Sequence, residues 1–401
     1  MLAYIRKAVI MCAALFASAV GGQVLKAPYT LLDNTKDGHT KLVALASKTN
    51  AAVKKGAVVV TCRDAPPFVY AVKGTSCPAM TRPVEPIDQH QALLNRGDLW
   101  GVNISGLEFA TELSVVEADI DFYADAGVKS IRLPIKRDRL LTEQKLAALD
   151  ALVKHATGRG IVVVLDEHSF GNIGDPRIRD FWLRVGPRYK GQHLVWFDLQ
   201  NEPGGGTWET WGPDSRELIH ALRAAGIDNV MVLEWRQSSG ASRADKNELS
   251  SEPCVSALCS LSRAGVKTLA DLDPLKRTVL SPHRYFDKDG SGTSKYCRTD
   301  LSPNGAFGSS VSMAQKLGVN LYLGEFAWGS YADDFPESCR TLAPKLIEYL
   351  KATPEFIGGA SWGWGPRWSK SYIFRGEHPD DPARTWATAN GQFVRSLMEA
   401  N

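Results

Sequence analysis

Eight short apolar runs recur between residues 99 and 365, and most of them are separated by segments with helical spacing of apolar residues. The runs are LWGVNISG, SIRLPI, IVVVLDEH, HLVWFDLQNEP, NVMVLEW, TVLSPHRYF, NLYLGEF and FIGGASWGWG. Runs that are apolar on both faces suit parallel strands buried on both sides. Eight such strand–helix units predict an α/β fold, a closed (β/α)8 or TIM barrel over residues 96–401.

The segments between the runs support this fold. LTEQKLAALDALVKHATGRG is an amphipathic helix with Thr142 as a possible cap, and VVEADIDFYADAG is a helix ended by Gly127. SSEPCVSALCSLSRAG, before the sixth run, includes a loop. The alternative is a doubly wound open sheet, which normally needs a glycine-rich first turn for its ligand, and the sequence has none.

The N-terminus has the order of a secretory signal peptide. Arg6 and Lys7 precede an apolar stretch at residues 8–16, and the small residues ASA come after it. We expect residues 1–23 to be removed and the mature protein to be secreted, to the periplasm or the extracellular space. The alternative is an uncleaved anchor, although the stretch is short for a membrane span. No other segment is long and apolar enough, so no membrane association is expected after cleavage.

Residues 24–95 lack the alternating strand and helix patterns of the barrel region. KGAVVVTCRDAPPFVYAVKGTSC predicts two short strands around a Pro-Pro turn, and TRPVEPIDQH is typical of a linker. We interpret this segment as an N-terminal extension, either a small β-module or a strap laid over the barrel.

Six cysteines lie beyond the expected leader, at positions 62, 77, 254, 259, 297 and 339. An even number in an exported chain suggests disulfides, and free buried thiols are the alternative. Proximity favours Cys62–Cys77 and Cys254–Cys259, which leaves Cys297–Cys339. No pair has zinc-finger spacing with histidines. The net charge of +3 favours no particular partner, and without a basic run nucleic-acid binding is not expected.

Polar residues stand at the ends of the apolar runs, where a barrel of this kind builds its active site. They are Arg132, Asp166-Glu167-His168, Asn201-Glu202-Pro203, Glu234-Trp235-Arg236, His283-Arg284-Tyr285, Gly324-Glu325-Phe326, and Trp362 with Trp364. We expect them to meet on one rim. Proline can follow Glu202 because the strand ladder is finished there and needs no further N–H.

Two of these residues suggest a mechanism. Glu202 and Glu325 end the fourth and seventh runs, across the barrel mouth from one another. A pair of carboxyl groups flanking a glycosidic bond is the usual equipment of glycoside hydrolysis, and a spacing of about 5–5.5 Å gives retention of configuration. The acid needs a raised pKa, and the nucleophile must stay ionised.

These residues resemble glycoside hydrolase family 5, within the clan of retaining barrel glycosidases. The strongest motifs are LQNEP and LGEF, and the supporting ones are GVNISG, RLPI, DEH, HRY and SWGWG. SPHRYFDKDGSGTSKYC followed by ESC resembles the endo-β-1,4-glucanase branch. In that branch a disulfide joins the matching cysteines, which supports Cys297–Cys339.

The resemblance implies that Glu202 is the acid/base and Glu325 the nucleophile. It implies that Arg132 and Tyr285 bind Glu325 and that His283 lies beside Glu202. Substrate contacts are implied for Asn201 at the sugar 2-hydroxyl, and for His168 and Trp362 at the sugar before the scissile bond. Trp235 and Trp328 are further candidates for the cleft floor. Glu167 and Glu234 are interpreted as supporting or surface groups.

We therefore expect a secreted, monomeric cellulase that cleaves internal bonds of cellulose or a related β-glucan without a cofactor or metal ion. The chain departs from the family pattern in Ser169-Phe170 after His168 and in the glycine-rich loop after Pro203. β-Mannanase, β-1,3-glucanase and xyloglucanase activities stay open. So do a catalytically inactive polysaccharide-binding barrel and a metal-dependent hydrolase using Asp166, His168, Glu202 and His283.

Overall fold

The computed structural model describes residues 88–109, 114–140, 142–245, 253–328, 336–369, 371–379, 386 and 388–399, and the backbone of three short strands nearer the N-terminus. The chain divides into two compact units, Met1–Ile87 and Asp88–Asn401. In the first unit, β1 (Leu25–Lys26), β2 (Val59–Thr61) and β3 (Val69–Val72) form an antiparallel sheet in the order β1-β3-β2. The expected signal peptide, the Cys62–Cys77 pair and most of the expected linker lie outside the described residues. The last three residues of that linker are described, and they are the cap and first residues of a helix, Asp88, Gln89 and His90.

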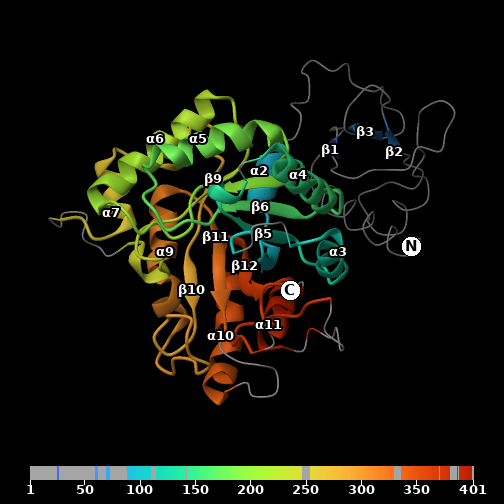
Figure 1. The fold of residues 1–401 in the computed structure, drawn as a ribbon, viewed down its shortest axis with the longest axis vertical. Coiled ribbons are helices and arrows are strands. Elements are labelled where there is room, and N and C mark those ends of the chain that lie inside the picture. Colours follow the sequence, from blue (N-terminus) through green and yellow to red (C-terminus); the bar gives the residue numbers. More distant parts are fainter. Residues whose placement is uncertain are drawn as a thin grey trace. The chain divides into compact units, whose positions relative to one another are not determined.

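The second unit is a closed parallel barrel (Figure 1). Its strands are β4 (Leu99–Ile104), β5 (Ser130–Ile135), β6 (Val162–Glu167), β7 (Val195–Asp198), β8 (Met231–Leu233), β9 (Thr278–Leu280), β10 (His283–Tyr285), β11 (Leu321–Ala327) and β12 (Phe356–Trp364). The sheet order is β10-β11-β12-β4-β5-β6-β7-β8-β9, and a further pairing of β9 with β11 closes it. The predicted (β/α)8 barrel is confirmed.

The sixth predicted strand is broken into β9 and β10 by Ser281 and Pro282. Proline has no N–H to give to a ladder, so the strand cannot continue through it. The Pro282 carbonyl instead accepts a hydrogen bond from Gly324 N. After the break, β10 pairs with β11 so that His283 is opposite Glu325.

Helices follow most strands and pack on the outside of the barrel (Figure 1). They are α2 (Gln89–Leu94), α3 (Glu117–Asp125), α4 (Glu143–Gly158), α5 (Pro176–Val185), α6 (Trp208–Ala224), α7 (Ala257–Arg263), α8 (Leu269–Leu272), α9 (Pro303–Leu317), α10 (Glu337–Ala352) and α11 (Ala389–Met398). The Thr142 hydroxyl accepts from Lys145 N at the start of α4, as predicted. Short 3-10 turns are η1 (Arg137–Arg139), η2 (Gly186–Tyr189) and η3 (Ala241–Arg243).

No helix in the described part of the chain combines the length and the apolar character that crossing a bilayer requires.

The barrel interior is apolar at one end and polar at the other. Residues of most strands form one buried cluster, which includes Val162 and Val164 of β6, Val230 and Val232 around β8, and Trp196 of β7. Side chains alternate along a strand, so the next residues facing this interior are acidic or polar at the carboxyl ends. The alternation of side chains that places apolar residues in the core therefore also places polar residues at the rim.

Helix α2 closes the apolar end of the barrel. Its Leu93 and Leu94 belong to the interior cluster together with Leu99, the first residue of β4. The Leu94 carbonyl accepts from the Asn320 side chain, just before β11. A helix that ends within the expected extension thus packs as part of the barrel unit.

Two predicted disulfides are present. Cys254–Cys259 bridges the start of α7, and Cys297–Cys339 joins the loop after β10 to α10. The second bond holds the segment that comes after His283 and Tyr285 against the outer helix layer.

Candidate active site

Arg132 of β5 is the centre of the polar end of the barrel. It is completely buried and forms ion pairs of 2.8–3.0 Å with four carboxyl groups, those of Asp166, Asp198, Glu234 and Glu325. One buried guanidinium faces more acid than it can neutralise. Burial is the main reason that the pKa values of Asp166 and Glu234 lie well above the usual carboxyl range.

Two asparagines complete the surroundings of Arg132. The side-chain oxygens of Asn103 and Asn201 accept from its Nη1 and Nη2 at 3.0 and 2.8 Å. The Asn103 amide also donates to the carbonyls of Gly324 and Ala360. Asn103 therefore ties β4 and Arg132 to β11 and β12, next to Glu325.

Glu325 is held through both carboxylate oxygens. Oε1 accepts from Arg132 Nη1 at 2.9 Å, and Oε2 accepts from the Tyr285 hydroxyl at 2.7 Å. Only 4% of the residue is exposed. Two fixed donors, one of them cationic, stabilise the negative charge and fix the direction of the carboxylate.

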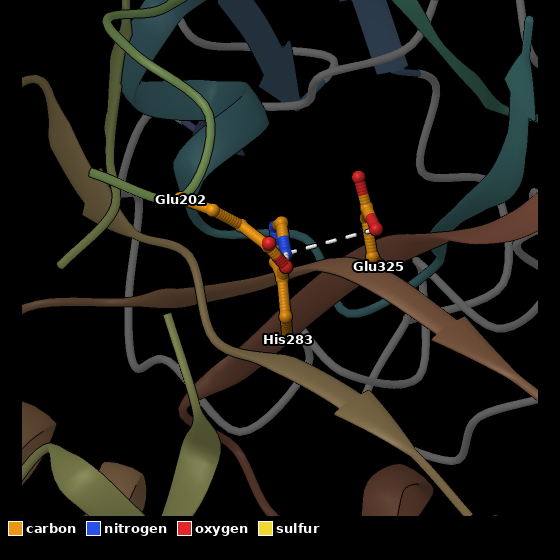
Figure 2. Close-up of side chains that lie close together, drawn as sticks. All are labelled: Glu202, His283 and Glu325. Carbon is orange, nitrogen blue, oxygen red and sulfur yellow. Dashed lines mark hydrogen bonds and ion pairs between the residues drawn. The ribbon is translucent and has the colours of Figure 1, made fainter. Parts of the chain in front are cut away.

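Glu202 lies across the mouth from Glu325, with His283 between them (Figure 2). One side-chain ligand atom of each residue lies within 4.8 Å of those of the other two. His283 Nδ1 is 2.9 Å from Glu202 Oε1 and 3.8 Å from Glu325 Oε2. The two predicted carboxyl groups thus face one space at the barrel mouth.

Glu234 positions both Glu202 and His283. Its Oε1 accepts from Arg132 and from His283 Nε2, and its Oε2 accepts from the Glu202 backbone N–H at 2.7 Å. Glu202 has a φ of +42°, a conformation that non-glycine residues rarely adopt. The Glu234 carboxyl group holds the backbone in this state and aims the Glu202 side chain.

The expected raised pKa of Glu202 is not found. Burial acts to raise it, but the hydrogen bond and charge of His283, aided by His168 and Arg132, hold the pKa of Glu202 below its usual value. Burial conversely lowers the pKa of His283, but Glu234, Glu325 and Glu202 outweigh it and raise that pKa well above the usual value. Both shifts in pKa favour the proton of this pair on the imidazole.

His168 and Trp362 form one wall of the site. Their rings stack with centroids 5.6 Å apart and planes 8° apart. His168 Nδ1 is 2.6 Å from Asp166 Oδ2, and burial lowers the pKa of His168 to about 4. The indole N–H of Trp362 donates to the Tyr372 hydroxyl. A neutral imidazole and a fixed indole therefore lie side by side.

These groups open into a cleft of about 530 Å³, a size suited to several sugar rings. Its lining includes seven of the eight residues predicted to form the site, all except the buried Arg132: His168, Asn201, Glu202, His283, Tyr285, Glu325 and Trp362. Further lining residues include Phe109, Phe170, Gln237, Arg243, Arg284 and Tyr372.

The three glycines after Pro203 lie against the loop that comes after His168. Gly204 N donates to Phe170 O, and Gly205 N donates to Gly171 O. A Cβ atom on Gly205 would lie 2.8 Å from the Asn172 nitrogen. Two loops of the rim can approach this closely because these positions carry no side chain.

The predicted roles of Trp235 and Trp328 in the cleft floor are wrong. Both side chains are fully buried. The Trp235 indole donates to Gly240 O, and Trp328 stacks on Phe286 and lines a separate hollow of about 390 Å³ between α10 and α11. Trp364 is also fully buried, which leaves Trp362 as the indole of the pair that reaches the cleft.

Asp198 and Asn103 were not among the predicted site residues. Glu234, interpreted from the sequence as a supporting or surface group, in fact contacts Arg132, His283 and the Glu202 backbone. The signal was present, because Asp198 ends the run VWFD and Asn103 lies in the run LWGVNI. A polar residue inside a strand buried on both faces must find partners, so it marks a buried network.

In the described ranges, one group of side chains has metal-ligand spacing, formed by Glu202, His283 and Glu325. Both ring nitrogens of His283 lie within 2.9 Å of carboxylate oxygens, and the surrounding acids raise its pKa well above the usual value. A protonated imidazole has no lone pair for a metal. The donor set therefore fits a proton relay better than a metal site.

The family model for cellulase, glycosyl hydrolase family 5, matches residues 97–367, which span the barrel from β4 to β12. The chain belongs to this family. It is accordingly a glycoside hydrolase, as predicted.

Characterised relatives agree with this membership. The chain is 28% identical over 310 residues to endo-beta-1,4-glucanase B of Aspergillus niger, covering 71% of this chain and 87% of the relative. Among solved structures, Cel5A (EG2) of Hypocrea jecorina aligns with a TM-score of 0.60 at 21% identity over 76% of this chain and 98% of that one. XacCel5A in complex with cellopentaose aligns with a TM-score of 0.61 at 22% identity over 75% and 99%. The solved structures support the barrel fold.

Proposed function

We propose that this protein is an endo-β-1,4-glucanase that hydrolyses cellulose or a related β-glucan with retention of configuration. The observation that carries the proposal is the pair Glu202 and Glu325, whose carboxylate oxygens approach within 4.8 Å across the barrel mouth. Retaining glycosidases use two carboxyl groups at about 5–5.5 Å, whereas inverting enzymes need more room for a water molecule. The named activity of the A. niger relative supports a β-1,4-glucan as substrate.

In the first step Glu325 attacks the anomeric carbon and Glu202 gives a proton to the leaving oxygen. The bond to the leaving sugar breaks, and a covalent glycosyl–Glu325 ester forms. Arg132 and Tyr285 support this step because they hold the attacking carboxylate by both oxygens. In the second step Glu202 takes a proton from water, and the water oxygen displaces Glu325.

The proton for the first step comes from the Glu202–His283 pair, whose atoms lie 2.9 Å apart. The lowered pKa of Glu202 describes the pair before a sugar fills the cleft. A bound sugar displaces water and disfavours separated charges, so it moves the shared proton toward Glu202. His283 thus stores the proton that the acid delivers.

The sugar before the scissile bond lies on Trp362, whose indole face packs against the C–H groups of a pyranose. His168 is neutral at physiological pH, so it can serve as a hydrogen-bond partner for a sugar hydroxyl. The Asn201 oxygen is committed to Arg132, so its NH₂ group is the part available to the 2-hydroxyl.

We also propose that the protein acts outside the cytoplasm as a monomer, with the part of the mature chain before Asp88 as an N-terminal extension. The two disulfides support export, because such bonds persist in oxidising compartments.

The test is a substrate panel of carboxymethyl cellulose, mixed-linkage β-glucan, mannan, xylan and xyloglucan, with and without a chelator. We expect the highest activity on β-1,4-glucan, no loss with the chelator, and a loss of several orders of magnitude in Glu325→Ala because the covalent step disappears. Highest activity on mannan would assign a different substrate. Near-normal activity in Glu325→Ala would refute the assignment of the nucleophile.

A further inference from the structure

The two carboxyl groups divide the barrel mouth into two halves of different character. Glu202 follows β7 and Glu325 lies on β11, so β12, β4, β5 and β6 lie on one side and β8, β9 and β10 on the other. The first side contributes Phe109, His168, Phe170 and Trp362 to the cleft, and we call it the aromatic half. The second contributes Gln237, Ser238, Arg243, Arg284, the carboxylate residue Asp289 and residues 290–292, and we call it the basic half after its two arginines.

The basic half receives the leaving part of the chain. Trp362 and His168, assigned above to the sugar before the scissile bond, lie in the aromatic half. A glucan that crosses the line between Glu202 and Glu325 therefore places its leaving-group sugars against Arg243 and Arg284.

Both arginines lack a carboxylate partner within the described residues. Arg243, in η3, is exposed, and Arg284, on β10, is half-buried with its Nε buried and without a hydrogen-bond partner in the described part of the chain. Nearby Asp287 offers little, because its oxygens accept from the backbone of Gly292, Thr293 and Ser294. Asp289 accepts from Ser291.

The electrostatic surroundings of Arg284 also favour the binding of an anion. Burial and the neighbouring Arg298 lower the pKa of Arg284, and Asp287 only partly offsets them. A partly buried cation with incomplete compensation gains more from an arriving anion than one in water does. A guanidinium is also well shaped for a carboxylate, which it can bind with two parallel hydrogen bonds.

The loop that presents Arg243 is firmly built. Gln237, Ser238 and Ser239 all have positive φ values of 62°, 56° and 43°. Such a run of left-handed non-glycine residues persists only where the surroundings fix it. Here the Ser239 hydroxyl donates to Ser281 O, and Ser239 O accepts from His283 N. The loop that leads to Arg243 is therefore hydrogen-bonded to the segment that carries His283 and Tyr285.

We propose that the basic half binds carboxylate groups on the leaving-group side of the glucan, so that the enzyme favours β-1,4-glucans whose glucose units carry acidic substituents. This inference rests on the proposed function, and it assigns Arg243 and Arg284 as specificity-determining residues.

The test compares kcat/KM on carboxymethyl cellulose with that on neutral hydroxyethyl cellulose. We expect the ratio in the parent to fall as salt rises from about 0.01 M to about 0.5 M, because salt screens exposed charges. At low salt we expect Arg243→Gln and Arg284→Gln each to lower the ratio about threefold, and the double variant about tenfold.

Three further variants control for charge and folding. Arg179→Gln removes the same charge from the exposed face of α5, away from the cleft, and should leave the ratio unchanged. Arg243→Lys and Arg284→Lys keep the charge and should retain most of the preference. Because Arg243 is exposed, its replacement carries little risk to folding.

The outcomes separate the two proposals. If the parent cleaves neither polymer, the proposed function fails and this inference fails with it. If the parent cleaves both, and the double variant keeps the low-salt ratio of the parent, only the assignment of the basic half is overturned.

Discussion

At the scale of single residues, His283 is the side chain whose titration governs the proposed mechanism. It contacts Glu202 at 2.9 Å and Glu234 at 2.8 Å, and its raised pKa means that the pair keeps its proton above the ordinary histidine value of about 6.5. The pair loses that proton as pH rises through the raised pKa. We therefore expect the alkaline limb of kcat/KM to lie above about pH 6.5.

Replacing His283 by Gln should move this limb. Glu202 would then hold its proton alone, and a carboxyl starts from a pKa of only about 4.3. Burial acts to raise that pKa, and we expect it to stay below that of the pair once the charge of His283 is gone. We expect the alkaline limb to shift to lower pH by more than about one unit, with kcat/KM reduced about 10²-fold near neutral pH. A pH–rate profile that keeps the parental limb would contradict the shared-proton account.

Glu234 is expected to act as a positioning residue. Glu234→Gln keeps the size of the side chain but removes the charge that most strongly raises the pKa of His283. We expect kcat to fall about 10- to 100-fold with KM changed less than about threefold, since small displacements of reacting groups are costly. The alkaline limb should also shift to lower pH. A lowered melting temperature with unchanged kcat and pH profile would show that Glu234 serves folding alone.

At the scale of elements, the Cys297–Cys339 bond should stabilise the barrel more than Cys254–Cys259 does. The first spans 42 residues and the second 5. In the chain-entropy view, a longer closed loop restricts the unfolded chain more, which corresponds to about 4 against about 2 kcal/mol.

Paired Cys→Ser variants measured by denaturant unfolding under oxidising conditions test this order. The Cys297–Cys339 variant should lose the larger part of the free energy of unfolding, and the Cys254–Cys259 variant serves as its control. A greater loss from the short bridge would contradict the entropic argument and would point to packing around α7.

The strands were predictable because each is an apolar run ending in polar residues, and the barrel rule then assigns those ends to one rim. The break at Pro282 was predictable in principle from the missing N–H, but a run such as TVLSPHRYF does not reveal that pairing resumes at once. The short helices α7 and α8 were obscured because disulfide and loop residues interrupt the helical period.

At the scale of the whole molecule, contacts between side chains across the barrel could not be predicted from the sequence. That Arg132 meets Asp166, Asp198 and Glu234 depends on strand tilt and stagger around the closed sheet, which no local pattern encodes. The burial of Trp235 and Trp328 could not be predicted from the sequence either. Each stands near a strand end, yet each turns into the helix layer, because the direction of a side chain past a strand end depends on loop geometry.

The division of the cleft into aromatic and basic halves is also a property of the closed barrel. Arg243 and Arg284 are 41 positions apart along the chain, and both line the cleft. They do so because Gly240, just before η3, forms a bridge with His283 of β10. Sequence proximity alone would not pair them.

The central claim, that Glu202 and Glu325 act together on one anomeric carbon with inversion at each of two steps, is tested most directly by following cellopentaose hydrolysis by ¹H NMR. The account predicts that the newly formed reducing end appears first as the β-anomer and only later equilibrates to the α form. First appearance of the α-anomer would mean single displacement by water and would contradict the assignment of Glu325 as nucleophile.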